Sequence, residues 1–261
     1  MINRIVIASI AIIATIFGAN AQSLVEQANK AYSEDKFIEA LKIYEEAVAK
    51  EGVSTELYYN IGNTYYRLGS KGKAILYYER ALALDPSNKD ARENLDFVNT
   101  KIIDKTVVDE ANIIVVFFRN VGNSLTSDGW ATTAIALFIL FIGAVALYIF
   151  AGSVIARKIG FFGGMALIIL DIVANYYAFS SKERTQNHSY AIITTSSVTL
   201  STSPRAPKDK TEEAFILNEG TKVLVIDSVD NNNNSRVERW YDVKADDTHR
   251  AWIKGSNIEK I

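Results

Sequence analysis

The chain has 261 residues, a formal net charge of −2 at pH 7 and no cysteine. The nearly neutral charge gives no electrostatic basis for nucleic-acid binding, and the missing cysteines exclude both a disulfide framework and a thiol nucleophile. The length allows two small soluble domains besides the long apolar stretches of the sequence.

The first apolar stretch begins the chain. A positive start at Arg4 is followed by apolar residues 5–17 and by Ala19-Asn20-Ala21, a small-x-small cleavage pattern. This order predicts a secretory signal peptide at residues 1–21, with an uncleaved membrane anchor as the alternative. In both cases the segment that follows is expected to begin outside the cytoplasm.

A 34-residue period follows within residues 22–104. The recurring positions are Ala40, Tyr44 and Ala47, which return as Ala74, Tyr78 and Ala81. The second copy, residues 55–88, carries almost the whole pattern of a tetratricopeptide repeat, and the first copy, residues 21–54, carries it weakly. The chain thus resembles this repeat family. The resemblance implies antiparallel helix pairs that stack and present a concave peptide-binding surface.

A further helix is expected after the second copy, at residues 85–95, with Ser87 as a residue that can cap its start. It is predicted to be a solvent-facing end helix and not a full repeat. Since roughly three or more repeats are usually needed for stability, we expect support from the membrane, from a second copy of the chain or from a partner.

The resemblance also implies which side chains line the concave surface. The candidate peptide-binding residues are Asn29 and Tyr32 in the first copy and Tyr59, Asn63, Tyr66 and Arg67 in the second. Asparagine and arginine can hold a peptide backbone or carboxylate, and tyrosine offers rigid apolar contact. The alternative is that these consensus residues serve packing alone.

Two further apolar stretches lie in the middle of the chain. Residues 129–156 contain no charged side chain, and residues 159–181 contain one, Asp171. Each stretch exceeds the ~20 residues that cross a hydrocarbon core of ~30 Å. The sequence therefore predicts a two-helix transmembrane hairpin at residues 129–181, and membrane lipid is an expected partner.

The hairpin would return the chain to the side on which the repeats begin. Both soluble domains are therefore expected on the periplasmic side of a cell inner membrane, with Arg157 and Lys158 in a cytoplasmic turn. Residues 105–128 form a predicted juxtamembrane segment. Its apolar part, residues 107–123, fits either an interfacial helix or a buried connecting helix.

Asp171 is the ionisable residue inside the predicted spans. A carboxyl group there costs ~2.5–3.5 kcal/mol on insertion scales, so it should face protein and not lipid. Its role is either helix pairing or proton transfer, or else it is a protonated acid bonded to a neighbouring helix. Asn175 lies on the same helix face, and Gly160 and Gly164 form a small-xxx-small pair, which completes the predicted helix-pairing set.

Past the hairpin, residues 188–261 favour strands separated by turns, which indicates a small barrel. Residues 191–200 are the expected opening strand, followed by L-x-E-G-T-x-V at 217–223, W-Y-x-V at 240–243 and a closing W-I at 252–253. This order resembles a bacterial SH3 domain, except that Ala251 stands where glycine is usual. The resemblance implies a peptide or cell-wall ligand. The candidate aromatic residues are Trp240, Tyr241 and Trp252, with core packing as the alternative for the two tryptophans.

Signals for catalysis are missing from the sequence. There is no Gly-x-Ser-x-Gly elbow or phosphate loop, and His188 and His249 stand apart in the chain. The Asp230–Ser235 tract lacks the acidic ligands of a calcium loop. We expect no enzyme activity, no metal site and no cofactor.

The order of these parts resembles the E-type protein of the Bacteroides aerotolerance (Bat) operon family. The expected fold class is multidomain: all-α tetratricopeptide repeat helices, an α-helical transmembrane hairpin and an all-β small SH3-like barrel. The resemblance implies a stress-related envelope complex, with partners that contain von Willebrand A domains and a MoxR-type ATPase. Two functions stay open, namely a membrane-anchored scaffold and an envelope sensor that binds wall polymer or peptide.

Overall fold

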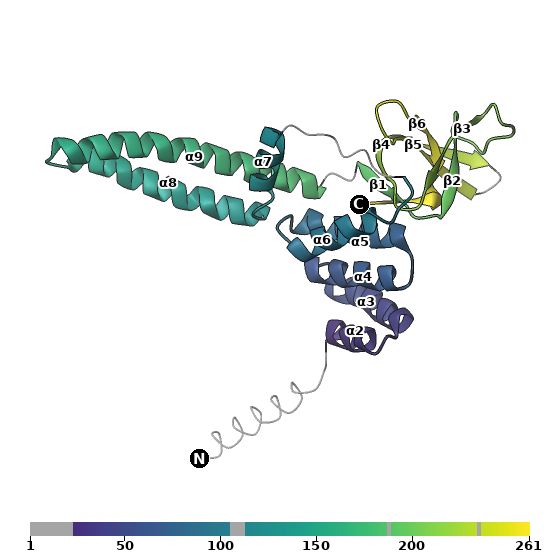
Figure 1. Cartoon of the computed structure of the whole chain (residues 1–261). Helices are drawn as coiled ribbons and strands as arrows, with labels where there is room; N and C mark the ends of the chain where they lie inside the picture. Colours follow the sequence, from purple (N-terminus) through teal and green to yellow (C-terminus); the bar gives the residue numbers. More distant parts are fainter. Residues whose placement is uncertain (1–22, 105–112, 187–188, 234–235) are drawn as a thin grey trace, which may run out of the picture. The chain divides into compact units, whose positions relative to one another are not determined.

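The computed structural model describes residues 23–104, 113–186, 189–233 and 236–261 (Figure 1). The predicted signal peptide, residues 1–21, lies outside these ranges, as does the part of the juxtamembrane segment from 105 to 112. The chain divides after Val53 into two compact units.

The first unit contains α2 (Leu24–Ser33) and α3 (Phe37–Glu51). Ser23 caps α2, because its hydroxyl accepts a hydrogen bond of 3.1 Å from the backbone N–H of Glu26. The two helices pack through buried small residues and Tyr44. The hydroxyl of Tyr44 donates a hydrogen bond of 2.6 Å to Asn29 Oδ1, which ties α3 to α2.

The second unit begins with α4 (Thr55–Arg67), α5 (Lys71–Leu84) and α6 (Lys89–Asn99). Gly62 lets α4 approach α5, since a Cβ there would lie 2.7 Å from the ring of Tyr78. The Tyr78 hydroxyl donates a hydrogen bond of 2.6 Å to Asn63 Oδ1. The bond from Tyr44 to Asn29 is thus repeated 34 residues later, so the sequence period corresponds to a repeated structural contact.

Helix α6 differs from its prediction in two respects. Asn88, and not Ser87, caps the helix by accepting a hydrogen bond of 2.8 Å from the N–H of Ala91, because the Ser87 hydroxyl donates to Asp85 instead. The helix also buries one face, formed by Ala91, Leu95 and Val98. It is therefore a packed helix with one solvent-facing side.

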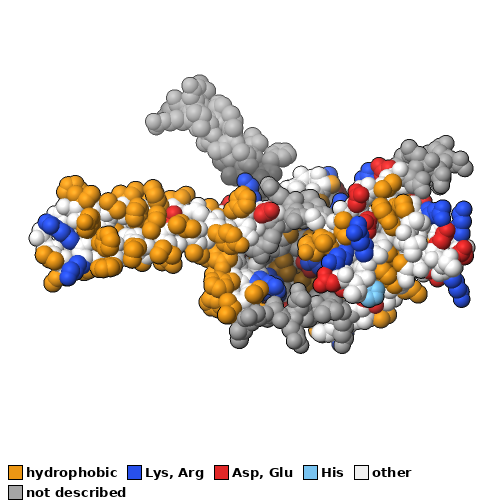
Figure 2. All heavy atoms as spheres, turned by 90° about the horizontal axis from the view of Figure 1, so that it is seen from above, with side chains coloured by type: hydrophobic (Ala, Val, Ile, Leu, Met, Phe, Trp, Pro, Cys, Tyr) orange, Lys and Arg blue, Asp and Glu red, His pale blue; other side chains and the backbone are white. Residues whose placement is uncertain are grey.

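The next elements are α7 (Ile113–Gly122), α8 (Ser127–Phe150) and α9 (Val154–Gln186). By length and composition, α8 and α9 could each cross a membrane. Their outer surface is covered with apolar side chains, and Lys and Arg side chains gather at the tip of the hairpin (Figure 2).

The α8–α9 contact follows a regular spacing along α9, with glycine or alanine at four of six positions. Positions 160, 164, 167, 171, 174 and 178 of α9 alternate in spacing between four and three, and all are buried or half-buried. This spacing keeps one face toward a partner helix. Gly160 is the closest approach, since a Cβ there would lie 2.7 Å from the carbonyl oxygen of Ala144 and from the backbone nitrogen of Tyr148.

The C-terminal part is a seven-stranded antiparallel sheet of order β3-β2-β6-β5-β4-β1-β7. The strands are β1 (Tyr190–Ile193), β2 (Ser197–Ser201), β3 (Glu213–Asn218), β4 (Lys222–Asn233), β5 (Arg236–Lys244), β6 (Arg250–Lys254) and β7 (Ile258–Lys260). Its core includes Ile193, Leu200, Val223, Val243 and Ile253.

The expected opening strand at residues 191–200 was wrong, because the structure has two strands there. β1 pairs with β4 and β7, whereas β2 pairs with β3 and β6. The chain must therefore turn between them. The N–H of Thr194 is bonded to Asn257 O, and the carbonyl of Ser196 accepts from Glu219, which stabilises this turn.

The close approach at Gly160 generates a prediction about the hairpin. Gly160→Ala should weaken the α8–α9 contact by ~1–3 kcal/mol, because the added methyl group meets backbone atoms that cannot move aside. Gly163→Ala is the matched control, since a Cβ at Gly163 meets nothing within 4 Å. Unfolding of the full chain by SDS in mixed micelles measures both. Equal effects would contradict this packing.

Candidate protein-binding surface

The predicted peptide-binding residues of the first unit take part in its own packing. Asn29 is exposed, and its Oδ1 accepts the hydrogen bond from Tyr44 described above. Tyr32 is half-buried and meets Phe37 edge-to-face, with ring centroids 5.3 Å apart. Both residues therefore hold α2 and α3 together, whether or not they also touch a ligand.

In the second unit, α4 and α6 place polar and aromatic side chains side by side. The Asn94 amide donates hydrogen bonds of 2.9 Å to Asn63 Oδ1 and 3.3 Å to the Tyr59 hydroxyl. Since Asn63 Oδ1 also accepts from Tyr78, one oxygen joins three helices. Asn63, Tyr59 and Asn94 are each half-buried, so this network reaches the surface already ordered.

Aromatic contacts extend the same surface. Tyr66 on α4 meets Phe97 on α6 edge-to-face, with ring centroids 5.8 Å apart. Phe97 is 49% exposed, and the Lys101 ammonium group lies 5.2 Å from its ring centroid. Arg67 is exposed at the end of α4. We call the set Tyr59, Asn63, Tyr66, Arg67, Asn94 and Phe97 the α4–α6 surface.

Two of the six residues of this surface, Asn94 and Phe97, were not predicted from the sequence. Asn94, Phe97 and Lys101 lie in or just after the helix that was expected to be a solvating end. Phe97 is a large apolar residue on an otherwise polar helix face. Such a phenylalanine is the sequence feature from which this part of the surface could have been predicted. The surface offers ordered amides, aromatic rings and a cation, which suits a peptide segment with apolar side chains.

The predicted helix-pairing residues separate into two groups. Gly160, Gly164 and Asp171 lie on the face of α9 that packs against α8, where Asp171 is half-buried. Asn175 is exposed, and its amide donates a hydrogen bond of 2.9 Å to the backbone oxygen of Asp171. The two glycines therefore allow α8 and α9 to pack closely within the hairpin.

The aromatic residues predicted in the sheet also separate. Trp240 is 5% exposed, whereas Tyr241 and Trp252 are half-buried. Tyr241 packs against the sheet core, and the Lys260 ammonium group lies 5.2 Å from its ring centroid. Trp240 thus occupies a packing position, as the core-packing alternative for this residue describes.

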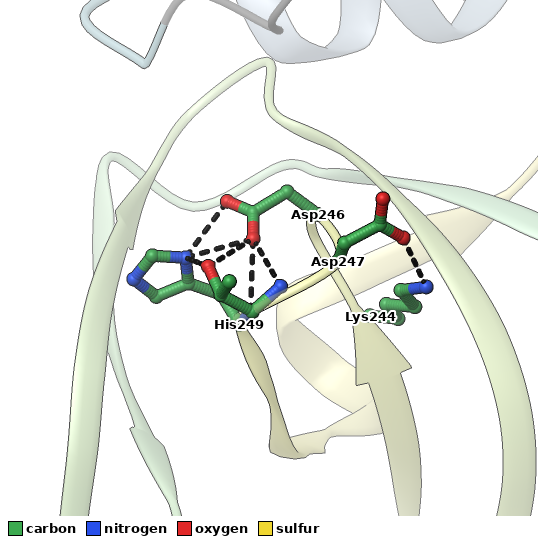
Figure 3. A network of polar contacts seen from close by, with 5 residues as sticks. Lys244, Asp246, Asp247 and His249 are labelled. Atoms are coloured by element: carbon green, nitrogen blue, oxygen red, sulfur yellow. Dashed lines mark hydrogen bonds and ion pairs between the residues drawn. The ribbon is translucent and has the colours of Figure 1, made fainter.

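The turn between β5 and β6 contains His249 (Figure 3). Asp246 accepts hydrogen bonds of 2.8 Å from both the hydroxyl and the N–H of Thr248, and His249 Nδ1 lies 2.7 Å from it. The bonds from Thr248, with a further contribution from His249, hold the pKa of Asp246 well below its ordinary value. Asp247 pairs with Lys244 on the other side. The network closes a turn, and no group of three metal-binding side chains occurs in the described ranges.

A separate set of contacts joins the sheet to α5. Glu219, in the turn between β3 and β4, accepts hydrogen bonds of 2.9 Å from the N–H of Gly72 and 3.3 Å from the Ser70 hydroxyl. Ser70 makes no capping bond to its own helix, and the first turn of α5 contains no acidic residue. Glu219 therefore caps α5 from the sheet, where the helix dipole favours a carboxylate.

Asp104 makes a further contact between the helical part and the sheet. Its carboxylate accepts hydrogen bonds of 2.6 Å from the N–H of Asn218, 2.9 Å from the Asn218 amide and 2.9 Å from the Thr221 hydroxyl. Burial acts to raise the pKa of Asp104, but the bonds from Asn218 and Thr221 outweigh it, so the pKa lies below its ordinary value. None of these partners belongs to the α4–α6 surface.

Two glycines allow this close approach. A Cβ at Gly72 would lie 2.5 Å from the carbonyl oxygen of Ile193. Gly220 has φ of +92°, a left-handed conformation, and a Cβ there would lie 2.7 Å from Ile102 and 2.9 Å from Ile75. Larger residues at these positions would separate the sheet from α5.

Comparison with known proteins supports the repeat. The family model described as Tetratricopeptide repeat matches residues 55–88 of this chain. No curated protein matches the chain. The match identifies the second copy as a repeat of the kind that is typical of protein–protein interaction and scaffold roles.

The cap on α5 generates a prediction. Glu219→Ala should increase amide exchange at the first turn of α5 and lower the free energy of unfolding by ~0.5–2 kcal/mol, as for the loss of an N-cap. Glu219→Gln keeps an acceptor oxygen and should lose less. Glu213→Ala, at an exposed glutamate of β3, is the matched control. Hydrogen exchange of the full chain, read over residues 70–75, tests this; unchanged exchange in Glu219→Ala would contradict it.

The lowered pKa of Asp104 predicts a pH dependence. Above its ordinary pKa of 3.8 the ionised carboxylate stabilises the folded protein. As the pH falls below that value and through the lower folded-state pKa, this contribution is lost, because the unfolded state binds the proton first. The difference in unfolding free energy between wild type and Asp104→Asn should therefore shrink from about pH 6 to about pH 2.5. A difference that stays constant or grows would show that ionised Asp104 does not stabilise the fold.

Proposed function

We propose that this protein is a non-enzymatic, membrane-anchored scaffold that binds a partner protein on its tetratricopeptide repeats. The observation that carries the proposal is the α4–α6 surface, where an ordered Asn63–Asn94–Tyr59 network lies beside the exposed Phe97. Ordered side chains lose little conformational entropy on binding, and an exposed aromatic ring offers apolar area.

The contacts of the sheet support the same role. Glu219 and Asp104 connect the sheet to α5 and to the segment after α6, and they leave the residues of the α4–α6 surface unused. A partner can therefore bind the repeats while the sheet stays in contact with α5. In this proposal the sheet is an SH3-like domain that provides a second contact, which raises the effective concentration of the partner.

The two apolar helices support the proposed location, since α8 and α9 could each cross a membrane. In this proposal they anchor the protein in a cell inner membrane, and an exported start would place both soluble parts in the periplasm. By its resemblance to the Bat family, the partners would be membrane proteins with von Willebrand A domains, in a complex served by a MoxR-type ATPase and linked to aerotolerance. The sensor alternative, with wall material bound by the sheet, has less support because Trp240 is 5% exposed.

The test alters the α4–α6 surface without disturbing its interior. Asn29 and Asn63 are poor targets, because their loss would leave the Tyr44 and Tyr78 hydroxyls without these acceptors. A triple variant with alanine at Tyr66, Arg67 and Phe97 should lose partner proteins in affinity capture from cross-linked membranes. A loss of tenfold or more corresponds to ~1.4 kcal/mol or more, and removing buried hot-spot side chains commonly exceeds that.

The matched control is a triple variant with alanine at Lys210, Glu213 and Ile216, three surface residues of the sheet region that include an exposed apolar side chain. It should recover the same partners as wild type while the α4–α6 variant does not. Identical recovery from both variants would reject the α4–α6 surface as the binding site. Loss in the control alone would move the binding site to the sheet.

A further inference from the structure

Helix α7 has an apolar surface that none of the described residues covers. Phe117 is 61% exposed, Ile114 59% and Phe118 55%. With Val121, they occupy positions i, i+3, i+4 and i+7, so they form one face of the helix. Arg119 lies toward the opposite side, next to Val116 in projection. Such a face is unusual at the surface of a soluble protein.

Contacts at its C-terminal end connect α7 to one end of the hairpin. The Tyr177 hydroxyl donates a hydrogen bond of 3.1 Å to Phe118 O, and the Trp130 indole N–H donates one of 3.1 Å to Gly122 O. The carbonyl of Gly122 has no partner within its own helix, so Trp130 satisfies a group that a helix end leaves open. A Cβ at Gly122 would lie 2.8 Å from the Tyr177 ring, so glycine is needed for this fit.

The positions of Trp130 and Tyr177 along the hairpin determine at which depth of a bilayer α7 would lie. From Trp130 to Phe150, α8 rises ~30 Å at ~1.5 Å per residue, which is the thickness of the hydrocarbon core. Trp130 and Tyr177 pack with ring centroids 5.0 Å apart at the end opposite to the Ala151–Ser153 turn, and not at the end where Arg157 and Lys158 lie in the first turns of α9. Tryptophan and tyrosine favour the boundary between hydrocarbon and headgroups.

We propose that α7 lies in the membrane interface, with its Ile114–Phe117–Phe118 face in the lipid and Arg119 directed to the headgroups. The inference rests on the transmembrane hairpin of the proposed function and adds a second kind of membrane contact to it. Trp130 and Tyr177 act as a clamp that fixes α7 at the level of the lipid headgroups. Basic side chains on the polar side of such a helix attract anionic lipid.

The chain lacks cysteine, so single-cysteine variants of the full protein can carry a nitroxide label without background. The labelled positions are Phe118→Cys on the apolar face of α7, Val116→Cys on its other side, Ile139→Cys in the middle of α8 and Glu93→Cys on α6. Phe117→Cys is a second probe of the apolar face. The protein is placed in vesicles of phosphatidylcholine and phosphatidylglycerol, and collision rates are measured with oxygen, which enters lipid, and with a water-soluble nickel chelate.

We expect the label at 139 to collide with oxygen and not with nickel, and the label at 93 to do the reverse. The labels at 118 and 117 should favour oxygen several-fold, at a shallower depth than 139, while 116 should be more accessible to nickel than 118. Nickel access at 117 and 118 equal to that at 93 would overturn the inference and leave the hairpin in place. Protection of 117 and 118 from both reagents would also overturn it, in favour of a protein partner or a second copy. Nickel access at 139 would reject the membrane anchor and the inference together.

Discussion

The carboxylate of Glu219 caps the start of α5 from the sheet, and with the Lys222–Glu79 ion pair it connects the repeat to the sheet. A helix exposes N–H groups in its first turn, and each needs an acceptor. Here Ser70 does not supply one to its own helix, and the sheet does. Gly72 and Gly220 bring the backbones close enough for the bond, and Asp104 orders the same turn from its other side. The sheet thus completes the hydrogen bonding of a helix that belongs to the repeat.

This arrangement has a consequence for the short repeat array. An array of two copies has two ends, and each end has a face that another repeat would normally cover. At the second copy, α6 packs against α5 through Ala91 and Leu95, and the sheet contacts α5 through Gly72 and Ile75. Two different structures therefore cover α5. The α4–α6 surface remains open because the contacts of the sheet with α5 and Asp104 do not involve its residues.

Local patterns in the sequence predicted much of this fold. The 34-residue period predicted α4 and α5 and the recurrence of Tyr44 as Tyr78, whereas the hydrogen bonds of these tyrosines to Asn29 and Asn63 were not predicted. The charge-free stretch that begins at residue 129 predicted α8, because length and hydropathy alone define such a helix. Contacts between distant segments were beyond this reasoning: Glu219 and Gly72 are separated by 147 residues, and no periodicity joins them. Phe97 was not predicted as a binding residue for a related reason, because its place in the α4–α6 surface depends on its contact with Tyr66 of another helix.

In the sequence, the α8–α9 hairpin lies between α5 and the sheet, and this order has a consequence for the Glu219 contact. If α8 and α9 cross a bilayer, the sheet is synthesised after both crossings, and it reaches α5 only when the chain has returned to the first side. A chain in which only one of the two helices crosses the membrane would place Glu219 and Gly72 in different compartments. The start of α5 would then keep open N–H groups and a weaker first turn. If α8 and α9 are membrane spans, the Glu219 contact depends on the topology of the chain, and the first turn of α5 is capped only in molecules in which both helices have crossed.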